Sequence, residues 1–202
     1  MARGRSALLV VDLQNDFCPG GALPVSDGDR IVPRVNRAIE LFERRGLPIL
    51  ASRDWHPRET RHFKAFGGAW PPHCIQKTKG ARFRPDLRLP KHAIILSKGM
   101  DPEEDSYSAF QAVTKEGRDL ESVLRDLDVN ELFLCGLATD YCVRASAIDS
   151  SKRGFRTWVL EDAVRGVEAK PGDSAAAVAD MKDHGVAFTR SKGLAKMLPP
   201  PM

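Results

Sequence analysis

One cysteine stands at a position where a reactive thiol would be useful. Cys142 belongs to the segment GLATDYCV, in which an apolar run ends and a helical pattern begins. A sulfur atom in the first turn of a helix lies near unpaired backbone N–H groups and the positive end of the helix dipole, which favour thiolate over thiol. The position therefore predicts a nucleophile, although a small apolar residue packed under the helix is the commoner role of a cysteine.

Asp12 and Lys98 are the candidate partners of this thiol, because each follows a different apolar run. Taken alone, each has an ordinary explanation as a turn-forming carboxylate or a solvated amine. Together with Cys142 they would supply a base that accepts the thiol proton and a positive charge that stabilises the charged pair. Cysteine hydrolysis needs these functions when no histidine is suitably placed, so we predict Asp12, Lys98 and Cys142 as the catalytic residues.

A long irregular segment carries a second group of reactive side chains. Asp54 and His56 alternate along an extended stretch, His62 follows, and His73 ends the sequence WPPH. Carboxylate oxygen and imidazole nitrogen are suitable ligands for zinc, iron or manganese. Any one of these residues could be an ordinary surface side chain. One carboxylate and three imidazoles in the same loop instead predict a metal site.

Three aromatic residues, Phe17, Trp70 and Tyr107, come from three different irregular segments. Packing in the core is the commoner role of such side chains, but loops seldom have cores of their own. A flat apolar slot made of aromatic rings would suit a planar ligand. We therefore assign these three residues to substrate binding.

Short apolar runs alternate with helical patterns along the chain. The runs are almost continuously apolar, as expected for strands covered on both faces. The predicted strands are residues 7–11, 48–52, 93–97, 131–135, 157–160 and 186–189. The predicted helices are residues 30–45, 118–127, 141–153 and 171–184. Glycine follows three of these helices, which supports their ends.

The alternation predicts an α/β fold with a doubly wound, mostly parallel six-stranded sheet and helices on both faces. Residues 53–91 and 98–117 have no periodicity, and an irregular segment of the first length is usually functional. Ligands of open α/β sheets bind beyond the carboxyl ends of the strands, where four predicted strands are followed by reactive side chains. We find no repeat or linker and predict one domain over residues 1–202.

Composition argues against several other classes of protein. A chain of 202 residues, 42% of them hydrophobic, can bury a core without disulfides, so the four cysteines are expected to be free thiols. The 31 basic residues form no stripe that would bind nucleic acid. No apolar run has the length of a membrane span, and the N-terminus lacks a signal-peptide pattern. We expect a cytoplasmic protein that binds neither nucleic acid nor membranes. Whether it forms a homo-oligomer is left open.

Five segments resemble the nicotinamidase/pyrazinamidase branch of the cysteine hydrolase superfamily that also contains isochorismatases. They are VDLQNDFCPGGALPV, SRDWHP, AWPPHC, SKGMDPEEDSYSAF and LCGLATDYCVRASAIDS. DWH, WPPHC and GLATDYCV in this order are highly specific. The resemblance implies an isochorismatase-like fold and an amidohydrolase that converts nicotinamide, and also pyrazinamide, to the acid and ammonia through a thioester on Cys142.

The resemblance also implies roles for single residues. It makes Asp12, Lys98 and Cys142 a catalytic triad, with the backbone amides of Ala138 and Cys142 as the oxyanion hole and commonly a cis peptide before Ala138. A divalent metal, zinc by preference with iron and manganese as alternatives, would be held by three ligands and waters. The implied ligands are Asp54, His56 and His73, and His62 matches a fourth ligand that only some members have.

The same resemblance assigns the aromatic residues. Phe17 and Trp70 match the residues that sandwich the pyridine ring, and Tyr107 matches a residue that closes the pocket. The acidic DPEED sequence before Tyr107 departs from the family pattern and leaves the breadth of substrates open. The resemblance implies nothing about the PPPM tail.

Two other functions stay open. Another isochorismatase-like or N-carbamoyl amidohydrolase would use the same scaffold, although isochorismatases need no metal ligands. A non-catalytic metal-binding or metal-storage protein would use the histidine loop, but it would leave Asp12, Lys98 and Cys142 without a role.

Overall fold

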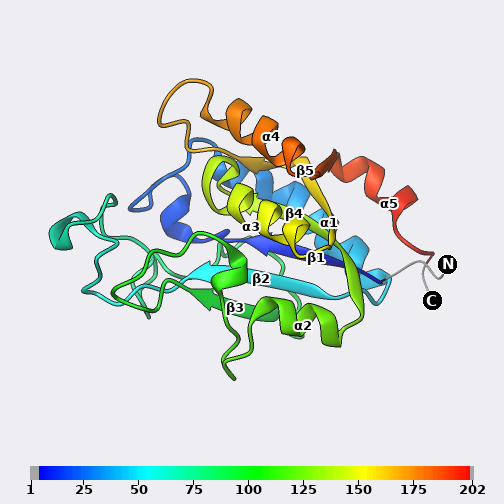
Figure 1. Ribbon diagram of the computed structural model, residues 1–202, viewed down its shortest axis with the longest axis horizontal. Helices are drawn as coiled ribbons and strands as arrows, with labels where there is room; N and C mark the ends of the chain where they lie inside the picture. The colour runs from blue at the N-terminus through cyan, green and yellow to red at the C-terminus, as the bar shows by residue number, and fades with distance from the viewer. Residues whose placement is uncertain (1–4, 201–202) are drawn as a thin grey trace.

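The computed structural model describes residues 5–200. They form one six-stranded parallel sheet with helices on both faces (Figure 1). The strand order is β3-β2-β1-β4-β5-β6. The strands are β1 (Arg5–Val11), β2 (Ile49–Asp54), β3 (Ile94–Lys98), β4 (Val129–Leu137), β5 (Arg156–Arg165) and β6 (Ala187–Thr189). The predicted parallel sheet is therefore confirmed. The last two residues of the PPPM tail and residues 1–4 lie outside the described part of the chain.

Helices cover both faces of the sheet, as predicted. They are α1 (Val32–Arg44), α2 (Leu120–Asp126), α3 (Arg144–Lys152), α4 (Asp173–Asp183) and α5 (Leu194–Met197). Helices α1 and α5 pack on one face, and α2, α3 and α4 pack on the other. Helix α5 was not predicted, because four residues are too few for a helical period to show.

The two cores explain why the strands are almost continuously apolar. Leu8 and Val10 of β1 belong to the core on the α1 face, and Leu9 and Val11 belong to the core on the α2 and α3 face. Successive side chains of a strand point to opposite faces, so both sets must be apolar when both faces are covered.

Two predicted boundaries differ from the structure by more than two residues, namely the end of β5 and the start of α3. Strand β5 continues beyond Leu160 through Glu161 and Asp162, which interrupt the apolar run. Two residues that precede α5 provide partners for both carboxylates. Arg190 binds Glu161, and Ser191 donates hydrogen bonds to Asp162. The predicted helix 141–153 begins instead as a π-helical turn, η5 (Thr139–Val143), and becomes α-helical at Arg144.

The strand order places a crevice at the carboxyl ends of β1 and β4. The chain goes outward from β1 to β2 and β3, and then returns to place β4 on the other side of β1. Crossovers leave these two neighbouring strands in opposite directions, which opens a ligand site between them. The irregular segments gather at this end of the sheet, at the left of Figure 1.

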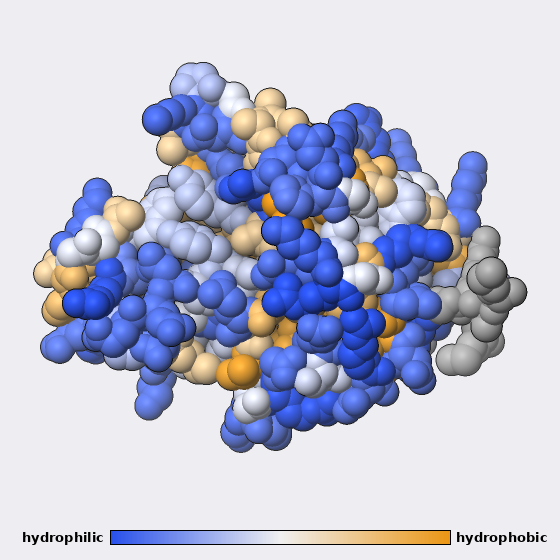
Figure 2. All heavy atoms as spheres, viewed as in Figure 1, coloured by the Kyte–Doolittle hydropathy of each residue, from blue (hydrophilic) through white to orange (hydrophobic). Residues whose placement is uncertain are grey.

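The outer surface in this view is mainly polar, with apolar residues scattered among charged ones (Figure 2). Among the helices of residues 5–200, none is long and apolar enough to cross a bilayer.

Candidate active site

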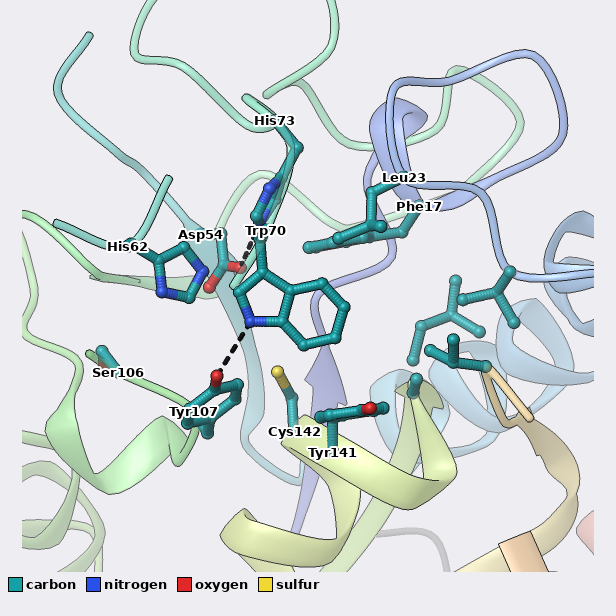
Figure 3. Close-up of a pocket in the computed structure, with 14 residues that line it drawn as sticks. Phe17, Leu23, Asp54, His62, Trp70, His73, Ser106, Tyr107, Tyr141 and Cys142 are labelled. Carbon is teal, nitrogen blue, oxygen red and sulfur yellow. Dashed lines mark hydrogen bonds and ion pairs between the residues drawn. The ribbon is translucent and has the colours of Figure 1, made fainter. Parts of the chain in front are cut away.

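Cys142 lies where the chain turns from β4 into α3. The peptide bond between Leu137 and Ala138 is cis, and η5 follows at once. The backbone amides of Tyr141 and Val143 donate hydrogen bonds to the Ala138 carbonyl, which fixes this turn. The Cys142 side chain is directed into a pocket and is 8% exposed (Figure 3). The cis bond that the resemblance implied before Ala138 is therefore present.

The three residues predicted as catalytic come together at this turn. Lys98 is the last residue of β3, and its Nζ lies 3.0 Å from Asp12 Oδ2 and 3.5 Å from Cys142 Sγ. Asp12 directly follows β1, and its Oδ1 accepts a hydrogen bond of 2.7 Å from Ser52 Oγ. A carboxylate, an ammonium and a thiol from three separate strand ends thus share one buried site.

Burial and charge oppose each other in this group. Burial disfavours the Lys98 ammonium, but the carboxylates of Asp12 and Asp54 outweigh it and raise the pKa of Lys98 well above its ordinary value. Burial raises the pKa of Asp12, against the opposing charge of Lys98. Burial acts to raise the pKa of Asp54, but Lys98 and the neighbouring histidines lower this pKa well below its usual range. Lys98 is therefore a fixed positive charge between two carboxyl groups.

The buried surroundings of Cys142 act on its pKa in the direction opposite to that expected from the helix terminus. Burial raises the pKa of the Cys142 thiol well above its ordinary value, although the Lys98 ammonium acts in the opposite direction. The charges of Asp12 and Asp54 and a hydrogen bond with Asp12 add to the increase. Burial thus has a larger effect on the pKa of this thiol than the Lys98 charge has.

The predicted metal ligands also lie together. Asp54 ends β2, and its Oδ2 lies 3.5 Å from His56 Nε2 and 3.7 Å from His73 Nε2. One ring nitrogen from each of His56, His62 and His73 forms a group in which all atoms lie within 4.8 Å of one another. Asp54 Oδ1 pairs with Lys98, so Asp54 links this cluster to the thiol site.

The other ring nitrogens are held by acceptors. His56 Nδ1 lies 3.0 Å from the Gly99 carbonyl, His73 Nδ1 lies 2.8 Å from the Pro71 carbonyl, and His62 Nδ1 contacts Asp105. A histidine that donates from Nδ1 presents the lone pair of Nε2, which is the usual arrangement around protein metals.

The residues fit a divalent metal. His56 Nε2 is fully buried and has no hydrogen-bond partner among the residues described, which is costly for a polar atom unless a cation binds it. Gly99 makes room for this ring, because a Cβ atom there would lie 2.4 Å from His56 Cε1. Burial lowers the pKa of His62 despite its bond to Asp105, which favours the neutral, metal-binding ring.

The pocket beside Cys142 is lined mainly by apolar and aromatic side chains. Phe17 packs against His73 with ring centroids 5.4 Å apart. Trp70 Nε1 donates a hydrogen bond of 2.9 Å to the Tyr107 hydroxyl across the pocket (Figure 3). All three aromatic residues predicted to bind substrate therefore line the pocket.

Sequence reasoning missed several residues of the site. Tyr141 lines the pocket and packs edge to face against Trp70 with ring centroids 5.0 Å apart, whereas its sequence pattern predicts only the start of a helix. Its place next to Cys142 could have suggested this role. Ser52 and Asp105 gave no signal, because one lies within an apolar strand and the other within an acidic stretch.

Comparison with known proteins gives an independent result. The isochorismatase domain family matches residues 6–192. A nicotinamidase of Escherichia coli is 40% identical over 195 residues, which cover 89% of this chain and 92% of the relative.

Two solved structures are similar over nearly their whole length. A pyrazinamidase of Pyrococcus horikoshii in complex with zinc has a TM-score of 0.85 and 46% identity, and the match covers 92% of this chain and 99% of that one. PnC1 of L. infantum in complex with nicotinate has a TM-score of 0.83 and 33% identity, with 93% of each chain covered. On the family match over residues 6–192, this chain belongs to the isochorismatase family.

Proposed function

We propose that this chain is an amidase that hydrolyses nicotinamide, and also pyrazinamide, to the corresponding acid and ammonia. The observation that carries the proposal is the buried group of Asp12, Lys98 and Cys142, in which Cys142 lies on the wall of an aromatic pocket. The E. coli relative is a nicotinamidase, and the L. infantum structure contains nicotinate. Apolar and aromatic side chains line this pocket, and such a lining suits a single aromatic ring with its amide group.

The arrangement supports a covalent mechanism. Asp12 takes the thiol proton as Cys142 Sγ attacks the carboxamide carbon, and Lys98 keeps its charge beside both groups. The negative oxygen of the tetrahedral intermediate is stabilised by the backbone amides of Ala138 and Cys142. Asp12 returns the proton to the leaving nitrogen, which departs as ammonia. Water then hydrolyses the thioester and releases the acid and the free thiol.

The pocket walls hold the ring during these steps. Phe17 and Trp70 contact its faces, and Tyr107 closes the pocket through its bond to Trp70. Asp54, His56 and His73, with His62 as a fourth ligand, would hold a divalent ion, and zinc is our first choice because the P. horikoshii structure contains it. When bound, this ion would supply a Lewis acid for the ring nitrogen.

An ammonia-release assay tests the proposal. The wild-type protein is expected to release ammonia from nicotinamide, and Cys142→Ala is expected to abolish it. His56→Ala should lower metal content and raise KM, whereas His92→Ala, at an exposed position outside the cluster, should match the wild type.

Other amides separate the alternatives. Release of ammonia from N-carbamoylsarcosine but not from nicotinamide would favour the N-carbamoyl amidohydrolase and contradict the proposal. Full turnover by Cys142→Ala would exclude the covalent mechanism. Selective alkylation of Cys142 would argue against a metal-storage protein, which needs no accessible thiol at this position.

A further inference from the structure

The segment that follows β3 lies over the histidine loop. The Pro102 carbonyl accepts hydrogen bonds from the Arg61 backbone amide, at 2.8 Å, and from Thr60 Oγ1, at 3.2 Å. Arg61 also forms an ion pair of 3.3 Å with Glu103. The acidic DPEED sequence is therefore bound to the residues that directly precede His62.

Asp105 ends this acidic sequence and contacts His62, one of the three clustered histidines. Its side chain is 58% exposed, but its Oδ1 lies 2.5 Å from Nδ1 of His62, whose side chain is only 4% exposed. The contact is thus made from the solvent side of a buried ring. It differs from the contacts of His56 and His73, whose Nδ1 atoms face backbone carbonyls that a side-chain substitution would leave in place.

The contact determines what His62 can do. A carboxylate at Nδ1 holds the proton on that nitrogen and fixes the ring plane, so the Nε2 lone pair remains for a cation. Without Asp105 the ring could rotate or carry its proton on Nε2. In both cases it would no longer offer a lone pair to the cluster.

We propose that Asp105 is the positioning residue that makes His62 the fourth protein ligand of the metal. This inference rests on the metal site of the proposed function. It gives the acidic sequence a role, because the segment after β3 then supplies an acceptor to His56 through Gly99 and to His62 through Asp105.

Zinc affinity, measured by competition with a chelator, tests the proposal without an activity assay. Asp105→Ala is expected to weaken zinc binding about 10- to 100-fold, the usual effect of removing a partner of a histidine ligand. Asp105→Asn keeps an acceptor oxygen and should stay closer to the wild type. Glu104→Ala removes a charge from the same acidic sequence, at a residue that makes no side-chain hydrogen bond or ion pair among residues 5–200, and should leave affinity unchanged.

A double-mutant cycle shows whether Asp105 acts through His62. In a His62→Ala background, Asp105→Ala should have no further effect on zinc affinity. The visible spectrum of the cobalt-substituted protein should change in the same way for Asp105→Ala and His62→Ala, because each loses one nitrogen ligand.

Three results would overturn the inference in distinguishable ways. Wild-type zinc affinity in Asp105→Ala, or equal losses with and without His62, would contradict the role of Asp105 and leave the metal site intact. A wild-type protein that binds no zinc would contradict both this inference and the metal of the proposed function.

Discussion

At the scale of single residues, the Asp12 carboxyl group lies between two opposing influences. Burial favours its protonated form, whereas the Lys98 ammonium at 3.0 Å favours the carboxylate. The neighbouring Cys142 thiol has a raised pKa, so both members of the pair hold protons more tightly than they would in water. Such a balance suits a group that accepts a proton in one step and returns it in the next.

We predict that Asp12→Asn lowers kcat for nicotinamide by about 10²- to 10⁴-fold, the usual contribution of a general base. Zinc content should remain near that of the wild type, because the proposed ligands Asp54, His56 and His73 are retained. Steady-state kinetics and metal analysis of the purified variant would check both expectations.

Ser52→Ala is the matched control for this variant. It removes the hydrogen bond to Asp12 Oδ1 but leaves the carboxylate and its ion pair with Lys98. We expect a much smaller loss of kcat than for Asp12→Asn. Equal losses of kcat in the two variants would contradict a role of Asp12 as general base. They would indicate that the position of the Asp12 side chain matters more than its charge.

At the scale of elements, the junction of β4 with η5 brings the site together. Gly136 has a φ of +118° and lies beside Val11, so a Cβ atom there would be 2.0 Å from the Val11 carbonyl oxygen. Only glycine allows this close approach. The ends of β1 and β4 therefore meet closely enough for Asp12 and Cys142 to share one buried site around Lys98.

Helix α2 leads into β4 and begins at a capping carboxylate that gives a pH-dependent prediction. The Asp119 side chain accepts hydrogen bonds of 2.8 Å and 2.7 Å from the backbone amide and the hydroxyl of Ser122. Both bonds lower the pKa of Asp119, and the bond from the backbone amide has the larger effect. Because the pKa is lower in the folded state, the stabilisation is present above the unfolded-state pKa and is lost as the pH falls through the folded-state value.

We predict that Asp119→Ala lowers the free energy of unfolding by about 1 kcal/mol at pH 7. The difference from the wild type should shrink as the pH falls below about 3.9, the ordinary value for aspartate. Urea unfolding at a series of pH values would measure both effects. Glu116→Ala, at a nearby exposed acidic residue, should have little effect, and a constant difference at every pH would contradict the role of the carboxylate.

At the scale of the whole molecule, the two cores share one sheet. Residues of β1 and β4 alternate between the α1 core and the α2 and α3 core, so neither core can open without the same strands. We therefore propose one domain, in which the group of His56, His62 and His73 lies on the irregular segment between β2 and β3.

We therefore expect residues 1–202 to unfold in one cooperative transition. Circular dichroism and the fluorescence of Trp55, Trp70 and Trp158 should follow the same urea curve. Free zinc at 100 times its Kd should add about 2.7 kcal/mol to the free energy of unfolding, and chelation should remove this gain. The gain should be retained by His92→Ala and largely lost by His73→Ala, whereas transitions that differ between the two probes would contradict one domain.

The sequence by itself determined the α/β class, the positions of all six strands and the residues that could do chemistry. Strand and helix patterns are set by neighbouring residues, so they can be read locally, and the spacing in SRDWHP, WPPHC and GLATDYCV marks reactive side chains directly. The C-terminal end of β5 and the π-helical start at Thr139 could not be predicted, because contacts with distant segments set them.

Only the tertiary structure decided how these side chains act on one another. It placed Lys98 between Asp12 and Asp54, brought Tyr141 to the pocket and set Asp105 against His62. It also raised the pKa of Cys142, where the local pattern had favoured a thiolate. Interactions between residues far apart in the chain depend on strand order and loop path, and a pKa depends on burial, and neither is contained in a local pattern of residues.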